Sequence, residues 1–241
     1  MSGGARFHVR RFSPLDLDDV WLRRECRAAW DHWSGRAHGV TIVDAPDGGS
    51  LVVKVGGARL FRGSRSLGAA RIARCLRAAG VPTPEVHAVC TQGRGRLCAL
   101  VMGHVPAVDQ GEALRSDAAD DWVASMARSI AKMHGAGIRH RDLKGSNVLL
   151  VRGNEGPEAW IIDLDGASVV RFGVSAAKRA RDLARLELSL DQLGAVGSCL
   201  LERYAAFAGW GPDEARGARG PMDAYKVRKR TRNERSAREL T

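Results

Sequence analysis

A charged motif, His140-Arg-Asp-Leu-Lys-Gly-Ser-Asn147, constrains this chain more than any other part of the sequence. It follows an amphipathic segment, from about Ser116 to His134, whose apolar spacing predicts a helix. Sixteen residues beyond Asn147, the apolar segment Trp160-Ile-Ile ends on the carboxylate of Asp163. Each polar residue alone would fit a turn, a cap or a solvated charge, but the set in this order predicts one catalytic site.

The motif resembles the catalytic loop of protein kinases, His-Arg-Asp-Leu-Lys-x-x-Asn, and Asp163 resembles the metal-binding residue of that fold. The resemblance implies that Asp142 accepts the proton of the attacking hydroxyl. Asn147 and Asp163 would supply the hard oxygen ligands that Mg²⁺ prefers. Lys144, two residues after Asp142, would stabilise the charge on the transferring phosphoryl group.

A further candidate lies in the first half of the chain. Lys54 is the single charge within the apolar segment Leu51–Val55, and a lysine in such a place is often just a residue of an edge strand. With a kinase-like loop downstream, the resemblance implies that Lys54 contacts the α and β phosphates of ATP. We therefore expect Lys54, Lys144, Asn147 and Asp163 to bind ATP, the last two through Mg²⁺.

Two halves of different secondary structure surround the motif. The first half predicts helices over 14–33 and 65–79 and strands over 40–43, 51–55, 86–90 and 97–102. The second half predicts helices over 116–134 and 175–207, with a short hairpin of strands over 148–151 and 160–162. This α+β layout predicts a bilobal protein-kinase-like fold over 1–215, with a small β-rich N-lobe (about 1–103) and a mostly helical C-lobe (about 104–215), followed by a basic C-terminal tail over 216–241.

Four segments resemble the lipopolysaccharide kinase (Kdo/WaaP, InaA-like) group of bacterial kinase-fold proteins. They are Gly80-Val-Pro-Thr-Pro84, the catalytic loop with its continuation Val-Leu-Leu150, Ile162-Asp-Leu-Asp165, and the helix-forming segment Arg181–Leu190. The resemblance covers about residues 50–210. It implies an ATP- and Mg²⁺-dependent kinase whose acceptor is an anionic glycolipid or sugar, a Kdo or heptose of the lipopolysaccharide core.

The sequence also departs from the kinase pattern. No Gly-x-Gly-x-x-Gly loop precedes Lys54, and residues 35–39 are a weak substitute. The segment 48–84 contains no acidic residue, so the predicted helix 65–79 lacks the glutamate that pairs with the strand lysine in kinases. No Ala-Pro-Glu segment follows Asp163, so we expect no long activation segment. Two alternatives therefore stay open: a small atypical protein kinase or ATPase of the RIO type, and a non-catalytic pseudokinase that only binds.

The net charge of +11 is unevenly distributed. The acid-free segment carries +7 from Lys54 and six arginines, and it fits either a phosphate-binding patch or a solvated helix face; these arginines are Arg59, Arg62, Arg65, Arg71, Arg74 and Arg77. Residues 226–241 carry +5 and fit either contact with an anionic membrane or an unstructured end. No aromatic residues alternate with these charges, which argues against a nucleic-acid partner.

Other classes of protein have little support. No apolar run approaches the ~20 residues of a membrane helix, and residues 1–11 lack the apolar core of a secretory signal. The five cysteines are scattered without a Cys-x-x-Cys pair, which argues against a disulfide framework or a zinc site. We expect a cytoplasmic protein with reduced thiols, peripheral at the inner face of the membrane if the tail binds lipid.

Overall fold

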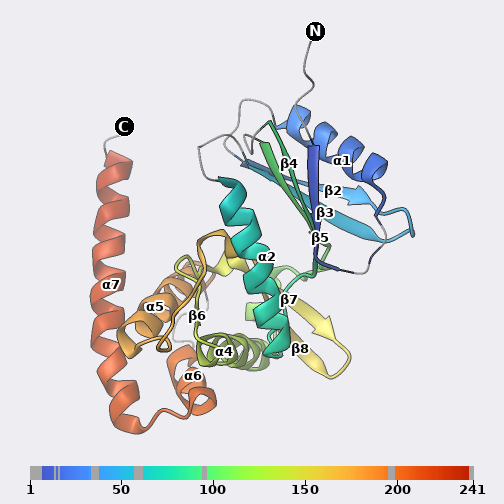
Figure 1. The fold of residues 1–241 in the computed structure, drawn as a ribbon. Coiled ribbons are helices and arrows are strands. Elements are labelled where there is room, and N and C mark those ends of the chain that lie inside the picture. The colour runs from blue at the N-terminus through green and yellow to red at the C-terminus, as the bar shows by residue number, and fades with distance from the viewer. Residues whose placement is uncertain are drawn as a thin grey trace. The chain divides into compact units, whose positions relative to one another are not determined.

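The computed structural model describes residues 7–13, 15, 17–33, 38–56, 62–93, 97–194 and 199–238. The chain divides into two compact units: unit 1 comprises residues 1–75 and 84–105, and unit 2 comprises 76–83 and 106–241. The predicted α+β fold class is confirmed, since unit 1 is rich in strands and unit 2 is mostly helical (Figure 1). The main division falls after Val105, close to the predicted 103, but the segment 76–83 belongs to the second unit.

Unit 1 is built on an antiparallel five-stranded sheet with the strand order β1-β4-β5-β3-β2. Its elements are β1 (Phe7–Arg11), α1 (Asp19–His32), β2 (His38–Asp44), β3 (Ser50–Gly56), α2 (Arg62–Ala78, whose last residues belong to unit 2), β4 (Val86–Gln92) and β5 (Leu97–Gly103). The hairpin predicted across residues 47–49 is confirmed: Ala45 N–H donates to Gly49 O (2.8 Å), and Gly48 has a φ of 86° that favours glycine.

The two faces of this sheet have different roles. Leu51, Val53 and Val55 of β3 are buried in a core that includes the inner face of α1. Because side chains alternate along a strand, Lys54 belongs to the opposite face, together with Val52. Across the ladder, Leu100 of β5 lies opposite Lys54. Lys54 therefore lies between Val40 of β2 and Leu100 of β5 on the face that α1 does not cover.

Helix α1 begins later than the predicted residue 14. Asp18 caps it, and its carboxylate accepts hydrogen bonds from the N–H groups of Val20 and Trp21, both at 2.7 Å. Trp21 and Trp30 are buried as the apolar stripe predicts, whereas Val20 is 80% exposed. Strand β1 was not predicted, because its alternation of apolar and polar residues is short and only Phe7 and Val9 are apolar.

Unit 2 consists of helices around two short strand pairs, β6 with β9 and β7 with β8. Its elements are α3 (Gln110–Arg115), α4 (Ala119–Gly135), β6 (Ile138–Arg139), β7 (Val148–Gly153), β8 (Gly156–Ile161), β9 (Ser168–Val169), α5 (Ala176–Gln192), α6 (Leu200–Ala208) and α7 (Pro212–Arg238), with short 3-10 turns at Gly145–Asn147 and Leu164–Gly166. The inner faces of α4, α5 and α6 form a core in which Met126, Ile130, Leu183 and Tyr204 are fully buried.

Two predicted helices are each divided in the structure. Ser116 was expected to begin one helix over 116–134, but it ends α3, where its N–H and Oγ both donate to Ala113 O. The predicted helix 175–207 is interrupted after Gln192, where Gly194 has a positive φ of 85° that ends a helix readily. Residues 195–198, between α5 and α6, lie outside the described part of the chain. The predicted hairpin over 148–162 is confirmed as β7–β8.

The segment predicted as a basic tail is a helix as far as Arg238. Helix α7 begins at Pro212 with two acidic residues in its first turn, and the N–H of Gly211 donates to Glu214 Oε2 (3.0 Å). It packs along α5 and buries Met222 and Ala218. The apolar residues of α7 are sparse, and Pro221 lies within it, so the sequence pattern did not predict a helix.

Ion pairs hold α7 against α5. Glu187, only 4% exposed, accepts hydrogen bonds from Arg219 and Lys226, each at 2.9 Å. Asp191 pairs with Lys226 (3.6 Å) and with Arg230 (3.0 Å). Lys226 and Arg230 belong to the residues that give 226–241 its charge of +5. Both are neutralised by carboxylates of α5.

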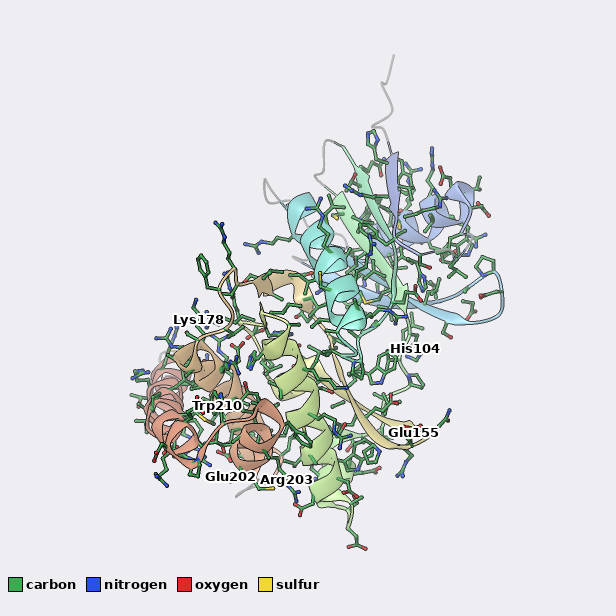
Figure 2. All side chains as sticks on the ribbon, turned by 60° about the horizontal axis from the view of Figure 1, so that its bottom comes forward. His104, Glu155, Lys178, Glu202, Arg203 and Trp210 are labelled. Carbon is green, nitrogen blue, oxygen red and sulfur yellow. The ribbon has the colours of Figure 1, made fainter. Side chains whose placement is uncertain are left out.

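Arg219 also bridges to α6, because its NH2 donates to Glu202 Oε1 at 2.8 Å. Glu202 lies beside Arg203 on this short helix (Figure 2). The three C-terminal helices are thus linked through charged side chains as well as through their apolar faces. No helix among the described residues is long and apolar enough to cross a membrane.

Replacing Glu187 with alanine should lower the free energy of unfolding by about 2 kcal/mol, because two cations would lose a buried counter-charge. Urea unfolding at pH 7 measures this change. Asp213→Ala in the same helix removes an exposed carboxylate and should change stability by less than about 0.5 kcal/mol. If Glu187→Ala unfolds at the same urea concentration as the wild type, these ion pairs do not hold α7.

Candidate active site

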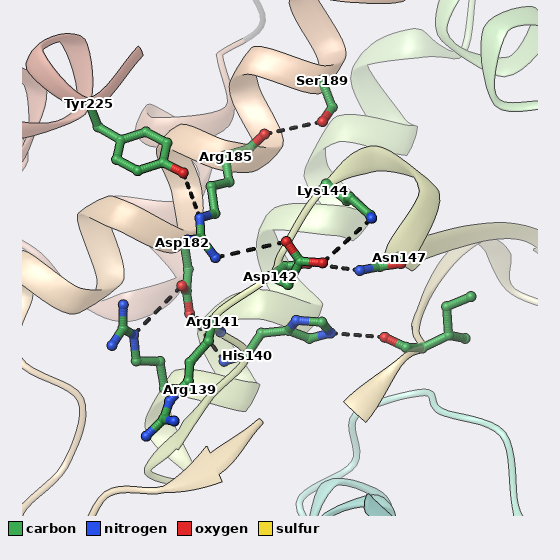
Figure 3. Close-up of polar contacts among 11 residues, drawn as sticks. Arg139, His140, Arg141, Asp142, Lys144, Asn147, Asp182, Arg185, Ser189 and Tyr225 are labelled. Atoms are coloured by element: carbon green, nitrogen blue, oxygen red, sulfur yellow. Dashed lines mark hydrogen bonds and ion pairs between the residues drawn. The ribbon is translucent and has the colours of Figure 1, made fainter. Parts of the chain in front are cut away.

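The loop between β6 and β7 presents Asp142 to solvent, with 58% of its side chain exposed. Residues 145–147 form a 3-10 turn, closed by a hydrogen bond from Asn147 N–H to Lys144 O (2.9 Å). The side-chain amide of Asn147 then donates from Nδ2 to the backbone oxygen of Asp142 (2.8 Å; Figure 3). The loop therefore folds back on itself and leaves the carboxylate of Asp142 accessible as a base.

Two cations flank the carboxylate of Asp142. Lys144 Nζ lies 3.5 Å from Oδ2, as the sequence led us to expect of a residue two positions away. Arg185 NH1, from helix α5, lies 3.9 Å from Oδ1 and was not predicted. Exposed pairs of this kind contribute less than about 1 kcal/mol to stability. Their importance is therefore local: they place positive charge next to the candidate base.

The β7–β8 hairpin brings Asp163 to the same place. Val148 pairs with Ile161, and Ile162 N–H donates to Asn147 O (3.0 Å), so Asp163 follows directly after the residue paired with Asn147. The ring of His140 donates from Nε2 to Ile162 O (2.8 Å), which ties the catalytic loop to the end of β8. Four residues predicted for the site thus lie together within unit 2, namely Asp142, Lys144, Asn147 and Asp163.

Two residues of this site adopt the left-handed backbone conformation that non-glycine residues usually avoid. Arg141 has a φ of 70° and Asp163 a φ of 59°, and among the described residues no other non-glycine φ is positive. Such conformations cost about 1–3 kcal/mol and persist where surrounding contacts enforce them, most often at functional sites. Here they turn the chain immediately before Asp142 and at Asp163.

A buried carboxylate holds the catalytic loop. Asp182 of α5 is fully buried, and its Oδ2 accepts hydrogen bonds from the N–H groups of His140 (3.1 Å) and Arg141 (3.4 Å). His134 Nε2 and Arg139 Nε lie 3.6 and 3.7 Å from the same carboxylate. Asp182 was recognised only as part of the segment 181–190. The signal for its role is an acidic residue directly before the buried Leu183 in α5.

The protonation states in this cluster follow from its burial. Burial alone would raise the pKa of Asp182, but the neighbouring ring of His134 and the positive charge of Arg139 outweigh it and hold that pKa below its usual value. Burial lowers the pKa of His134, more than the attraction of Asp182 raises it. We therefore take Asp182 as ionised and His134 as neutral at pH 7, with its Nε2–H directed to Asp182.

Tyr204 completes the surroundings of His134. Burial raises the pKa of Tyr204 to about 12, so its hydroxyl keeps its proton and can donate to Nδ1 of His134 (2.9 Å). Arg179 NH1 approaches the same hydroxyl at 3.4 Å. Both nitrogens of the buried imidazole therefore face a polar partner.

The donor atoms in the loop suit a divalent cation that prefers oxygen. Because the backbone oxygen of Asp142 can only accept, the nitrogen of the Asn147 amide must face it, and Oδ1 faces away. Among the described residues, no group hydrogen-bonds to this Oδ1. Mg²⁺ is commonly held by one or two protein oxygens together with the phosphates of its substrate, and Asn147 with Asp163 fit that requirement. No cluster of three or more histidine, cysteine or acidic side chains that could hold a metal occurs in the described residues.

The remaining predicted residues lie outside this cluster. Lys54 is in unit 1, on the face of the sheet opposite α1. The four described arginine side chains of the acid-free segment are exposed on α2, whose other face buries Leu76 and Ala70; they are Arg65, Arg71, Arg74 and Arg77. The side chains of Arg59 and Arg62, and residues 35–37 of the weak glycine segment, lie outside the described residues.

Comparisons with known proteins show which family the chain is similar to. The model of the lipopolysaccharide kinase (Kdo/WaaP) family matches residues 58–198, more than half of the chain. A protein named 3-deoxy-D-manno-octulosonic acid kinase in Xanthomonas campestris pv. campestris is 34% identical over 181 residues, covering 66% of this chain and 68% of the relative. The protein of the same name in Stenotrophomonas maltophilia is 31% identical over 187 residues, covering 67% and 73%.

Among solved structures, the chain is similar to the Rio2 kinase of Chaetomium thermophilum in a complex with ADP, Mg²⁺ and phosphoaspartate. The TM-score is 0.50, and the match covers 93% of this chain and 82% of that one. The sequence identity is 17%, so the likeness concerns the fold alone. A kinase-like fold, as the sequence predicted, is therefore confirmed.

Adding a methyl group at Gly145 should disturb the loop. A Cβ there would lie 3.0 Å from Gln110 Oε1 and 3.2 Å from Ser189 Cβ, and Gln110 is held by its hydrogen bonds to Gly145 O and Val148 O. We expect Gly145→Ala to lower the free energy of unfolding by about 1–3 kcal/mol in urea. Gly217→Ala, where the new Cβ meets nothing, is the matched control. Full stability of Gly145→Ala would contradict this close packing.

The buried imidazole predicts a pH dependence of stability. The unfolded chain protonates His134 near pH 6.5, whereas the folded protein keeps it neutral to lower pH. Stability should therefore be complete above pH 6.5 and fall as the pH drops below it, by at most about 1.4 kcal/mol per pH unit. Urea unfolding at several pH values should show a flatter dependence for His134→Gln. His104→Gln, on an exposed histidine, is the control; equal slopes for His134→Gln and the wild type would refute the assignment.

Proposed function

Because the chain belongs to the lipopolysaccharide kinase (Kdo/WaaP) family, we propose that it transfers the γ-phosphoryl group of ATP to a sugar hydroxyl of the lipopolysaccharide core. The name shared by its relatives favours 3-deoxy-D-manno-octulosonic acid (Kdo) as that sugar over heptose. One observation carries the proposal: within the matched region, Asp142, Lys144, Asn147 and Asp163 occupy one end of the β7–β8 hairpin. A chain of this family that only bound nucleotide would have no need of an exposed base between two cations.

In the reaction, the acceptor hydroxyl attacks the γ-phosphorus in line with the bond to the β-phosphate. The new O–P bond forms as the bond between the γ-phosphorus and the bridging oxygen breaks, and ADP leaves. Asp142 accepts the hydroxyl proton, because its carboxylate is exposed and its backbone is held by Asn147. Lys144 lies beside Asp142 and stabilises negative charge on the phosphoryl group in the transition state.

Asn147 and Asp163 would hold Mg²⁺ through the amide oxygen and the carboxylate. When bound, the ion neutralises charge on the phosphates of the nucleotide. The left-handed conformation of Asp163 directs the chain away from β8 at that residue, and the hydrogen bond from His140 to Ile162 fixes the residue before it. Both ligands are thus positioned by the same hairpin and the same loop.

Lys54 would bind the α and β phosphates. Its cross-strand partners Val40 and Leu100 are apolar, an environment that suits an adenine ring with its phosphates. Helix α2 contains no acidic residue, so the glutamate that pairs with this lysine in many kinases is absent from that helix. The missing glutamate is a difference from other kinases in unit 1 only, and the catalytic loop in unit 2 keeps its residues.

The enzyme would act on its glycolipid at the cytoplasmic face of the membrane. Toward the end of α7, within the side chains that the structure describes, Arg228, Lys229 and Arg232 are exposed and make no ion pair with α5. Each basic residue close to an anionic bilayer contributes about 1 kcal/mol to binding. Lys226 and Arg230 do not contribute in this way, because Glu187 and Asp191 already pair with them.

Asp142→Asn should abolish transfer, because an amide cannot accept the proton. With radiolabelled ATP and lipopolysaccharide, we expect the rate to fall by about 10²–10⁴-fold while the Kd of Mg-ATP, measured by calorimetry, changes little. Asp120→Asn is the matched control, since that carboxylate is 77% exposed and pairs only with Arg203 and the Cys199 thiol.

The destination of the label decides among the functions. Label on the Kdo of lipopolysaccharide supports the proposal, and label on heptose places the chain in the same family with another acceptor. Label on protein, or release as free phosphate without lipopolysaccharide, would favour the RIO-like alternative. Mg-ATP binding with equal and negligible turnover in the wild type and Asp142→Asn would identify a pseudokinase.

A further inference from the structure

Arg185 lies next to the candidate base, on the side away from the residues assigned to the nucleotide. Figure 3 shows Lys144 and Asn147 on one side of Asp142 and Arg185 on the other. Arg185 reaches this position from α5, one turn after Asp182, so the helix that holds the catalytic loop also carries this cation. Its NH1 is 3.9 Å from Asp142 Oδ1, which is too long for a hydrogen bond.

The guanidinium is held in place by the C-terminal helix. Its Nε donates to the hydroxyl of Tyr225 on α7 (2.7 Å), and its carbon lies 5.6 Å from the centre of the Tyr225 ring. These contacts use one of the five N–H groups of Arg185 and fix the plane of its fork-shaped guanidinium group. Within the described residues, neither NH1 nor NH2 makes a hydrogen bond. Arg185 therefore presents a pre-oriented pair of donors, with 32% of its side chain exposed.

A fixed arginine fork with free donors is suited to a carboxylate, which it can bind through two parallel hydrogen bonds. Asp142 does not satisfy it, because only one of its oxygens approaches and at an ion-pair distance. A lysine would suffice to steady a phosphoryl group, and Lys144 already occupies the opposite side. The side of Asp142 occupied by Arg185 is thus the side from which an acceptor hydroxyl with an acidic neighbour would approach.

We propose that Arg185 binds the carboxylate of the acceptor sugar and so selects a sugar acid over a neutral sugar. The inference rests on the function proposed above, in which the acceptor is a 3-deoxy-octulosonic acid. Binding the carboxylate at Arg185 places the sugar ring against Asp142, where one of its hydroxyls meets the base. Tyr225 takes part by positioning Arg185, so α7 contributes to acceptor selection.

The test compares two acceptors in the full-length protein. One is a truncated lipopolysaccharide that ends in 3-deoxy-D-manno-octulosonic acid, and the other is the same molecule with its carboxylates methyl-esterified. The wild type should prefer the acid by about 10- to 100-fold in kcat/KM, the effect of one charged hydrogen-bonded pair. Arg185→Gln should lower kcat/KM for the acid by about 10- to 100-fold more than kcat/KM for the ester, with the KM for ATP unchanged.

Further variants separate recognition from folding. Arg185→Lys keeps the charge but not the fork and should recover only part of the preference. Tyr225→Phe removes the hydroxyl that holds Nε and should reduce the preference by a few-fold. Arg152→Gln, which removes an exposed arginine near the far end of β7, is the matched control and should behave as the wild type.

Each outcome decides the matter. Equal losses for acid and ester in Arg185→Gln would show a general electrostatic or structural role and overturn the inference, as would a changed KM for ATP. In either case, a wild type that phosphorylates the acid leaves the proposed function standing. A wild type that phosphorylates neither acceptor overturns 3-deoxy-D-manno-octulosonic acid as the acceptor, and the inference with it.

Discussion

The active arrangement depends on one buried carboxylate. Asp182 lies inside unit 2 without exposure to solvent, where an unpaired charge would cost several kcal/mol. Two backbone N–H groups of the catalytic loop, together with Arg139 and His134, offset that cost. Because it accepts the hydrogen bond of Arg141 N–H, the carboxylate holds Arg141 in its left-handed conformation. This conformation turns the chain and directs Asp142 outward. The positions of the base and of its neighbours follow from this single contact between a helix and a loop.

Helix α5 organises the surroundings of that contact through its successive turns. Arg185 faces Asp142, Ser189 packs closely against Gly145, and Glu187 binds the cations of α7. The excess of basic residues at the C-terminus thereby acquires a structural reason, since two of those charges compensate carboxylates on α5. Through Tyr225, the same helix pairing also positions the arginine that we assign to acceptor recognition.

Much of the architecture could be predicted because it follows from local patterns. Alternating apolar residues around Asp47-Gly-Gly predicted the β2–β3 hairpin, and the run 148–162 predicted β7–β8. Helix α7 could not be predicted in this way, because its glycines and Pro221 disfavour a helix and its few apolar residues form no stripe. It is stabilised by partners on α5, which no local pattern reveals. The break near the start of the predicted helix 116–134 could not be predicted either. Ser116 ends α3, where its N–H and Oγ donate to Ala113 O, and it does not begin the next helix.

For the site, the sequence predicts the chemistry from an aspartate, a lysine, an amide and a second carboxylate at the spacings of a kinase-like loop and hairpin. Their order along a short segment suffices for this prediction, because one hairpin register brings Asn147 and Asp163 together. The residues that support them follow from the packing of distant segments and could not be predicted. Asp182 and Arg185 lie about 40 residues away in a segment rich in arginine and leucine, and their roles arise from helix packing. Contacts between distant segments leave no periodic pattern in the sequence. They form only when the core of unit 2 brings those segments together.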